Sequence, residues 1–294
     1  MHDDEVHTDV RLVGRLIADQ FPEWAGLSLQ PVRSTGTDNA LYRLGTELTV
    51  RLPRIHWAVG NVDREFEWLP RLAPRLPVAV PVPLARGRPG DRFPWPWTVC
   101  RWVEGENPVV GAIVDPGALA SDLAGFVAAM HRIDPSGGPP AGSGVPLATK
   151  DADARTAIAA IGDLVDAAAV TAVWEAALRE PPWTGSPVWV HGDLSPGNVV
   201  CVDGRLSGVL DFGVMGIGDP ACDLSVAWSL LPTEARPLFR DAAEVDAATW
   251  RRARGWALFT ALVQLPYYRT RSPALATQAF HVIDQLLTEP GEHR

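Results

Sequence analysis

The spacing of apolar residues in the first hundred positions predicts a mixture of helices and strands. Apolar side chains recur at helical spacing from Thr8 to about Gln20, and Phe21-Pro22 ends that pattern. Two short apolar runs, Ala40–Leu44 and Leu48–Leu52, predict strands. A second helical pattern covers Val62–Leu69, with Pro70 interrupting or restarting it, and Trp97–Val103 (WTVCRWV) predicts a buried strand.

Helical periodicity dominates the rest of the chain. The expected helices cover Pro116 to about His131, the alanine-rich stretch Asp151–Glu180, Trp250–Leu265 and Pro273–Leu287. Three short apolar runs predict strands at Val188–Val190, Asn198–Val202 and Leu206–Leu210. Asp241, Glu244 and Asp246 are candidates for lining a cationic substrate pocket, although ordinary solvated surface is the commoner role of such residues.

Polar residues follow these three strands at the points where each strand ends. His191, Gly192 and Asp193 break the first run, and Asn198 comes five positions after Asp193. The second run turns at Asp203-Gly204, a hairpin dipeptide that tolerates positive φ. The third run ends at Asp211. Three oxygen-bearing side chains are therefore expected to converge at strand ends.

This set of side chains suits phosphoryl transfer, in which a protein mainly positions the reactants while magnesium bridges the phosphates. Asp211 supplies a carboxylate and Asn198 an amide carbonyl, and Mg2+ accepts so few protein ligands because it keeps waters and binds phosphates. Asp193 is left as the base that orients an acceptor hydroxyl and takes its proton. His191 is expected to hold the loop by hydrogen bonding rather than to enter the chemistry.

The sequence HGDLSPGN, from His191 to Asn198, resembles the protein-kinase catalytic loop in its aminoglycoside-phosphotransferase form, and LDFG resembles the metal-binding element. The later GDPACDL matches the next family motif, in which Asp223 caps or braces the catalytic loop. The resemblance implies an α+β, two-lobed, protein-kinase-like fold. Residues 1–103 would form a nucleotide-binding lobe with a small antiparallel β-sheet, and residues 104–294 a larger, mainly helical, catalytic and substrate-binding lobe.

The same resemblance implies a site for ATP or GTP in the first lobe. Ser34, Thr35 and Gly36 lie where the family carries its nucleotide-covering loop. Arg51 stands where a kinase-like fold has its phosphate-binding lysine, and an exposed strand arginine is the other reading of this residue. Glu65 is the expected partner of Arg51.

Two details of this nucleotide site remain open in the sequence. Glu67 is the alternative to Glu65 as the partner of Arg51. The segment from Arg101 through Val103 to Gly105 occupies the place of the hinge, whose backbone would bind the nucleotide base.

Composition narrows the classes of partner. A net charge of −9 disfavours binding to nucleic acid and is compatible with a cationic small substrate. The three cysteines show no CxxC spacing, which gives little support to a zinc site or a disulfide framework. No apolar run approaches the roughly 18 residues of a membrane helix. The acidic start is unlike a secretion signal, so a cytoplasmic location and no membrane partner are expected.

The expected function is that of a small-molecule kinase that moves the γ-phosphate of a magnesium–nucleoside triphosphate to a hydroxyl. An aminoglycoside antibiotic is the preferred acceptor, with a role in resistance, and macrolides, amino alcohols and sugars are the alternatives. A nucleotide-binding module that has lost transfer is the rival from another class, because Arg51 replaces a lysine. The HGD form of the loop and the lack of an APE segment disfavour a protein kinase.

Overall fold

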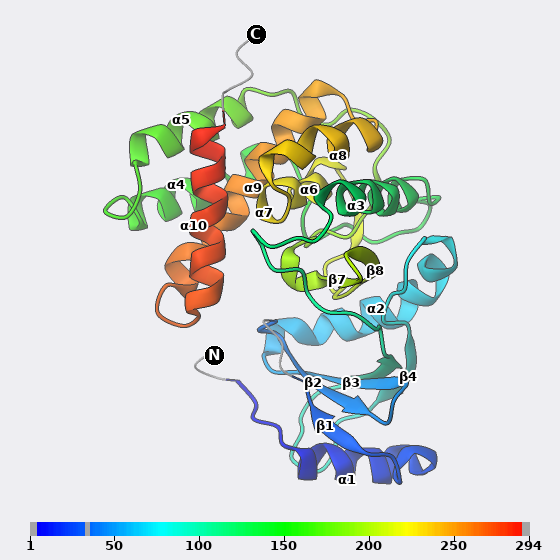
Figure 1. Cartoon of the computed structure of the whole chain (residues 1–294). Helices are drawn as coiled ribbons and strands as arrows, with labels where there is room; N and C mark the ends of the chain where they lie inside the picture. Colours follow the sequence, from blue (N-terminus) through cyan, green and yellow to red (C-terminus); the bar gives the residue numbers. More distant parts are fainter. Residues whose placement is uncertain (1–4, 33–35, 290–294) are drawn as a thin grey trace. The chain divides into compact units, whose positions relative to one another are not determined.

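The computed structural model describes residues 5–32 and 36–289, and the chain divides into two compact units (Figure 1). Unit 1 comprises Met1–Glu106 together with the segments Val200–Val202 and Ser207–Gly213. Unit 2 comprises Asn107–Val199, Asp203–Leu206 and Val214–Arg294. Each unit therefore combines segments that lie far apart in the sequence.

Unit 1 is built on a five-stranded antiparallel sheet with the strand order β1-β2-β3-β5-β4. Its strands are β1 (Leu29–Pro31), β2 (Asn39–Leu44), β3 (Leu48–Pro53), β4 (Pro83–Gly87) and β5 (Trp97–Arg101). The central strand β3 is buried along its whole length, whereas β2 alternates between buried and half-buried positions. The middle strand of the sheet is therefore buried on both faces, and alternation appears nearer the edge of the sheet.

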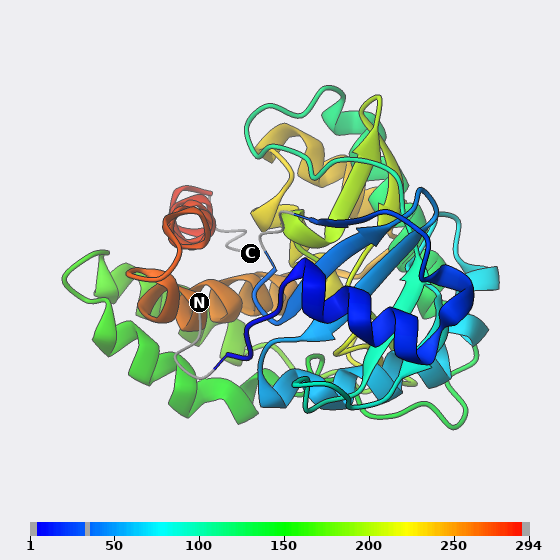
Figure 2. The same ribbon diagram turned by 90° about the horizontal axis from the view of Figure 1, so that it is seen from below.

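Two helices pack on this sheet, α1 (Val10–Gln20) and α2 (Val59–Leu72). Helix α1 begins where Asp9 accepts a hydrogen bond from the Leu12 N–H. Its buried face, which includes Val13 and Ile17, joins the apolar core under Val50 and Trp97, and the helix lies along the sheet in Figure 2. One amphipathic stripe therefore fixes α1 to the sheet.

Helix α2 is longer than the sequence suggested, because it begins before Val62 and continues through Pro70 to Leu72. A proline inside a helix removes one N–H donor, and near the C-terminal end that loss affects only the last turn. Buried Leu69 and Leu72 hold this last turn against the rest of unit 1. Packing therefore outweighs the helix-breaking tendency of Pro70.

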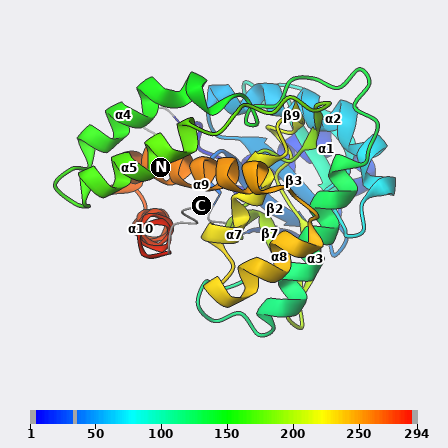
Figure 3. The same ribbon diagram turned by 90° about the horizontal axis from the view of Figure 1, so that it is seen from above.

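Unit 2 is mainly helical. Its longer helices are α3 (Pro116–His131), α4 (Asp151–Ala160), α5 (Ala167–Leu178), α8 (Arg236–Ala242), α9 (Ala247–Tyr268) and α10 (Pro273–Thr288), and two short ones are α6 (Ala221–Leu224) and α7 (Val226–Ser229). Helix α9 contacts α4, α5, α6, α7 and α10, and Figure 3 shows it running between α4 and α5 on one side and α10 on the other. It is the central helix of this unit.

Two small strand pairs accompany the helices. Strand β6 (Val188–Val190) pairs with β9 (Gly216–Gly218), and β7 (Val199–Val202) pairs with β8 (Arg205–Val209). The turn between β7 and β8 has positive φ at Asp203 and Gly204, as the hairpin dipeptide predicted. Strand β9 gave no signal in the sequence, since two of its three residues are glycine.

The predicted α+β fold class, with a small antiparallel sheet and a larger helical part, is confirmed. The assignment of residues 1–103 and 104–294 to nucleotide-binding and catalytic lobes stays a prediction. Unit 1 extends to Glu106 and includes 200–202 and 207–213, which that prediction placed in the second lobe. Among the helices of the described residues, none combines the length and the apolar character needed to span a membrane.

A buried ion pair inside unit 2 gives a first prediction. Arg252 on α9 donates to both oxygens of Asp219, with Nε–Oδ2 at 2.8 Å and Nη2–Oδ1 at 3.2 Å, and both side chains are about 5% exposed. Replacing Arg252 by Met leaves a buried carboxylate without its counter-charge, so the free energy of unfolding should fall by about 3–5 kcal/mol.

Chemical denaturation measures this effect, and Arg155→Met is the matched control. Arg155 pairs with Asp151 on the surface of α4, where both side chains are largely exposed. The control should change the free energy of unfolding by less than about 1 kcal/mol. Equal losses of unfolding free energy in the two variants would show that burial does not make the Arg252–Asp219 pair more important for stability than a surface pair.

Candidate functional site

The loop that follows β6 carries the predicted base. Trp189 and Val190 are buried at the end of the strand, and His191 is fully buried. Gly192 has φ of +83°, a left-handed conformation that favours glycine. The chain therefore turns sharply at Gly192 and presents Asp193 immediately after a rigid strand end.

Two side chains hold the backbone of this loop. Asp223 on α6 is fully buried, and its two oxygens accept the N–H groups of His191 and Gly192, each at 2.8 Å. The Nδ1 atom of His191 accepts the N–H of Asp193 at 3.2 Å. His191 thus makes the kind of loop-holding hydrogen bond that the sequence led us to expect, and Asp223 is placed as a brace of the catalytic loop.

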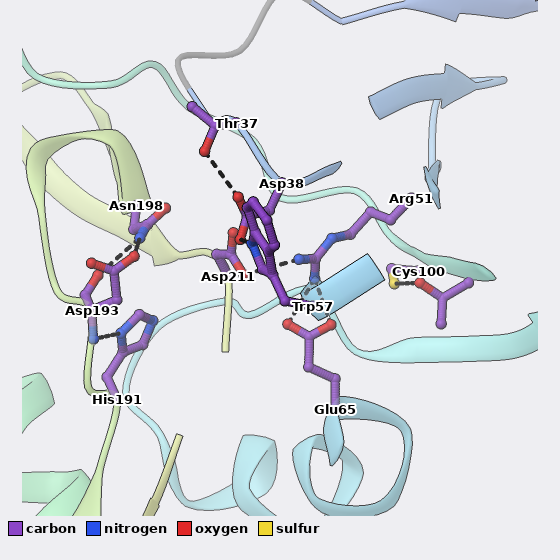
Figure 4. Close-up of polar contacts among 11 residues, drawn as sticks. Thr37, Asp38, Arg51, Trp57, Glu65, Cys100, His191, Asp193, Asn198 and Asp211 are labelled. Atoms are coloured by element: carbon purple, nitrogen blue, oxygen red, sulfur yellow. Dashed lines mark hydrogen bonds and ion pairs between the residues drawn. The ribbon is translucent and has the colours of Figure 1, made fainter. Parts of the chain in front are cut away.

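Asp193 and Asn198 contact each other directly. The Asn198 Nδ2 donates to the backbone oxygen of Asp193 at 2.8 Å and to its Oδ2 at 2.9 Å (Figure 4). With its nitrogen used in this way, the amide turns its Oδ1 away from Asp193. The pair therefore offers one carboxylate held in place and one carbonyl oxygen available to a cation.

The second half of the loop has a brace that the sequence did not reveal. The Asn107 Nδ2 lies within hydrogen-bonding distance of the backbone oxygens of Pro196, Gly197 and Val199, at 3.3, 3.0 and 2.7 Å. Asn107 stands about ninety positions earlier in the chain. No local pattern marks such a contact, because it depends on how distant segments fold together.

The predicted basic residue of unit 1 is buried among carboxylates. Arg51 on β3 donates from Nη1 to both oxygens of Glu65, at 2.8 and 2.7 Å, and from Nη2 to Asp211 Oδ1 at 3.1 Å (Figure 4). Glu65 is therefore the partner of Arg51. The alternative, Glu67, has a side chain that is 57% exposed and lies 3.9 Å from Arg71.

Electrostatics keeps Arg51 charged in this setting. Burial alone would lower the pKa of the Arg51 guanidinium, but the carboxylates of Glu65 and Asp211 outweigh burial and raise that pKa. Burial raises the pKa of the Glu65 carboxyl, because it disfavours the charged form, and the positive charge of Arg51 acts in the opposite direction. The exposed-strand reading of Arg51 does not fit a side chain that is 9% exposed and ion-paired twice.

Asp211 lies two residues after the end of β8 and has φ of +59°, a conformation uncommon for residues other than glycine. Its side chain is 35% exposed and uses Oδ1 for Arg51. A carboxylate and an amide carbonyl are hard oxygen donors that suit magnesium. Among the described residues no group of three or more His, Cys, Asp or Glu forms a ready metal cage. A metal bound at Asp211 would take most of its ligands from elsewhere, such as water and phosphate.

The other predicted nucleotide-site residues are placed only in part. Ser34 and Thr35 lie outside the described residues, and Gly36 is the first described residue after them. Just beyond Gly36, Asp38 accepts hydrogen bonds from the Thr37 hydroxyl at 2.9 Å and the Trp57 indole at 3.3 Å. Asp38 and Trp57 thus anchor the end of the predicted loop, which the sequence did not indicate.

The predicted hinge follows β5. The Arg101 N–H donates to Val82 at 3.0 Å, so the sheet already uses that donor. Val103 is buried, and no described residue accepts a hydrogen bond from its N–H. Of the two predicted hinge residues, Val103 therefore has the backbone donor that a nucleotide base could use.

Asp193 also lies in the wall of a pocket within unit 2. The loop from Gly192 to Ser195 forms one side, and Ser143 together with residues of α6, α7, α9 and α10 forms the rest. The α9 contribution repeats every four residues, at Trp256, Thr260 and Gln264, which places these side chains on one face. The sequence signal for this pocket wall is the presence of polar residues on the buried side of the expected helices.

Comparisons with known proteins identify the family of the chain. The model of the phosphotransferase enzyme family (APH) matches residues 29–256. An aminoglycoside 3'-phosphotransferase of Escherichia coli is 44% identical over 59 residues, which is 20% of this chain and 22% of that protein. The matched segment thus spans less than a quarter of this curated relative.

Solved structures show the same fold over nearly the whole chain. The GDP complex of aminoglycoside 2'-phosphotransferase-IIIa has a TM-score of 0.73 at 20% identity, covering 95% of this chain and 99% of that one. Macrolide 2'-phosphotransferase from Brachybacterium faecium, solved as the apoenzyme, has a TM-score of 0.64 at 24% identity, covering 97% and 99%. At these identities the likeness concerns the fold.

The brace at Asp223 gives a second prediction. Asp223→Ala removes the acceptor of two N–H groups next to the base, and each unpaired buried donor costs about 1–3 kcal/mol. We expect the free energy of unfolding in urea to fall by about 3 kcal/mol. Asp284→Ala, at an exposed position of α10, is the control and should stay within about 0.5 kcal/mol of the wild type. Similar unfolding free energies for the two variants would contradict the bracing role of Asp223.

Proposed function

Because the chain belongs to the phosphotransferase enzyme family (APH), we propose that it transfers the γ-phosphate of a magnesium–nucleoside triphosphate to a hydroxyl of a small molecule. One observation carries this proposal: the Asp193 carboxylate, held by Asn198, stands in the wall of a pocket. A molecule in that pocket would present its hydroxyl to a fixed base.

In the proposed reaction the acceptor hydroxyl gives its proton to Asp193 as its oxygen bonds to the γ-phosphorus. The bond from that phosphorus to the bridging oxygen breaks, and the nucleoside diphosphate leaves. Asn198 Oδ1 and Asp211 would hold magnesium, which supplies neutralisation of the phosphate charge when bound. Asn198 also keeps Asp193 oriented through its Nδ2.

Arg51 is proposed to contact phosphate oxygens with the guanidinium donors that Glu65 and Asp211 leave unused. A guanidinium has five N–H donors, so two carboxylate partners do not exhaust it. Glu65 would orient Arg51, as the resemblance implied. Gly36 with Ser34 and Thr35 would cover the phosphates, and the segment Arg101–Val103 would bind the base.

The names of the structural neighbours support the proposed donor and acceptor classes. One neighbour was solved with GDP and another, aminoglycoside phosphotransferase APH(2'')-Ib, with ADP, which supports either GTP or ATP as donor here. Aminoglycoside and macrolide phosphotransferases both occur among the neighbours. Aminoglycosides, preferred from the sequence, and macrolides are therefore the two acceptor classes to compare, with amino alcohols and sugars behind them.

The role of Asp193 gives a third prediction. Asp193→Asn keeps the shape of the side chain and an oxygen for Asn198 but removes the base, so transfer should fall by about 10²–10⁴-fold. Magnesium-dependent transfer of labelled γ-phosphate, from ATP and from GTP, to pooled aminoglycosides and pooled macrolides measures it. Nucleotide affinity, measured by calorimetry, should be unchanged. Equal loss of transfer and nucleotide binding would count against a base.

The same assay separates the enzyme from the rival function. If nucleotide and magnesium bind but no label moves to any hydroxyl compound, the chain is a nucleotide-binding module without transfer. The presence of Asp193, Asn198 and Asp211 together favours the enzyme.

Arg51 gives a fourth prediction. Arg51→Lys should keep part of the nucleotide affinity, because an ammonium retains the charge, whereas Arg51→Met leaves Glu65 buried without a counter-charge. We expect the Met variant to lose about 3–5 kcal/mol of unfolding free energy and nucleotide binding with it. Arg43→Met on β2 is the control, because it removes an ion pair with Glu104, whose side chain is 68% exposed. Unchanged nucleotide affinity in both Arg51 variants would exclude phosphate contact.

A further inference from the structure

The segment that follows the predicted hinge is held firmly against β7 and β8 within unit 1. Glu106 and Cys201 exchange two backbone hydrogen bonds, at 3.0 and 2.8 Å. The Ser207 hydroxyl donates to the backbone oxygen of Glu104 at 2.7 Å. Gly105 has φ of +135°, and a Cβ atom there would lie only 2.9 Å from the backbone oxygen of Cys201. The backbone is therefore fixed as far as Glu106, where this part of unit 1 ends.

Asn107 is the next residue, and its side-chain amide bonds to the backbone on both sides of Asn198. Its Nδ2 atom lies 3.3 and 3.0 Å from two oxygens that precede Asn198, those of Pro196 and Gly197. It lies 2.7 Å from the oxygen of Val199, which follows Asn198. An amide nitrogen has two hydrogens, so the three acceptors share them. One side chain therefore holds the turn that carries Asn198 from both ends.

Asn198 needs a fixed backbone because its own side chain has two tasks. Its Nδ2 donates to the backbone oxygen of Asp193 at 2.8 Å and to Oδ2 of the same residue at 2.9 Å. Its Oδ1 faces away from Asp193 (Figure 4), and the proposed function assigns this oxygen to magnesium. A shift of the backbone would move both atoms of the amide, and magnesium demands near-ideal octahedral geometry.

Asn107 is expected to contribute little to stability by itself. The residue is exposed, and a hydrogen bond that water can replace adds little net free energy to folding. Water satisfies a carbonyl oxygen without fixing its position, whereas a side chain that follows the anchored Glu106 does fix it. Loss of the amide should therefore leave the fold intact and loosen the turn.

Resting on the function proposed above, we propose that Asn107 is a positioning residue for the magnesium ligand Asn198. It acts by holding the backbone from which the Asn198 amide reaches Asp193. The magnesium requirement of transfer is thus set in part by a side chain that lies outside the loop from His191 to Asn198. A high magnesium concentration compensates for the lost amide, because ligation at Oδ1 restores the same orientation.

Metal binding tests this role in the full chain loaded with a non-hydrolysable analogue of ATP or GTP. The probe is Mn2+, which prefers the same oxygen ligands and is followed by electron paramagnetic resonance. Asn107→Ala should weaken Mn2+ binding about fivefold, which corresponds to one lost hydrogen bond. Asn107→Leu keeps the volume without the amide and should weaken it equally. Gln30→Ala, which removes an exposed amide of β1, is the control and should change nothing.

A double-mutant cycle shows whether Asn107 acts through Asn198. Asn198→Ala removes the ligand and weakens Mn2+ binding in its own right. If Asn107 only positions that ligand, adding Asn107→Ala to Asn198→Ala should cause no further loss. The same loss in both backgrounds, or unchanged Mn2+ binding in Asn107→Ala, overturns the proposal.

Hydrogen exchange measures the turn without metal or nucleotide. The Asn198 N–H donates to the backbone oxygen of Ser195 at 2.9 Å, and its exchange should be about fivefold faster in Asn107→Ala than in the wild type. Exchange at an unchanged rate contradicts the positioning role. Thermal unfolding of each variant confirms that it is folded before the rates are compared.

Transfer assays keep this proposal distinct from the proposed function. In Asn107→Ala the magnesium concentration for half-maximal transfer should rise about fivefold, while kcat at saturating magnesium stays within about twofold of the wild type. Transfer with an unchanged magnesium requirement upholds the kinase and overturns the role of Asn107. The expected loss of Mn2+ binding, in a chain whose wild type transfers no phosphate, upholds that role and overturns the kinase.

Discussion

The Asp223 carboxylate is the contact on which the loop from His191 to Asn198 depends. Its two oxygens accept hydrogen bonds from the N–H groups of His191 and Gly192. The Asp223 side chain is fully buried, so water does not compete for these oxygens. A loop with positive φ at Gly192 would otherwise leave polar backbone groups unpaired in the interior of unit 2. Helix α6 carries Asp223 and packs on α9. The central helix of unit 2 therefore supports, through Asp223, the backbone position of Asp193.

The sequence was sufficient for features that are encoded locally. The hairpin turn at Asp203-Gly204, the stripe of α1 and the central strands β2 and β3 follow from dipeptide preferences and periodicity. The pairing of Arg51 with Glu65 was expected from resemblance, and the structure chooses it over Glu67 because Glu65 faces the interior. The functional roles of Asp193, Asn198, Arg51 and the hinge stay predictions.

Features made by distant segments escaped prediction. Asn107 reaches a loop some ninety positions away, and strand β9 is formed by glycines that allow close approach of the Pro139–Ala141 backbone. Pro70 lies inside α2 because neighbouring apolar contacts hold the helix end. In each case tertiary packing decides the conformation, and a single sequence records that packing only as residues that look ordinary in their local setting.

The fourfold spacing of pocket residues along α9 has an evolutionary consequence. Trp256, Thr260 and Gln264 share one face, while Arg252, one turn earlier, is committed to Asp219. Changes at positions 260, 264 and 278 alter the pocket wall without replacing a residue of the loop that carries Asp193 or of the Arg252–Asp219 ion pair. Under the proposed function, substitutions on this face of α9 would therefore change which molecule the pocket admits while the loop that carries Asp193 keeps its geometry.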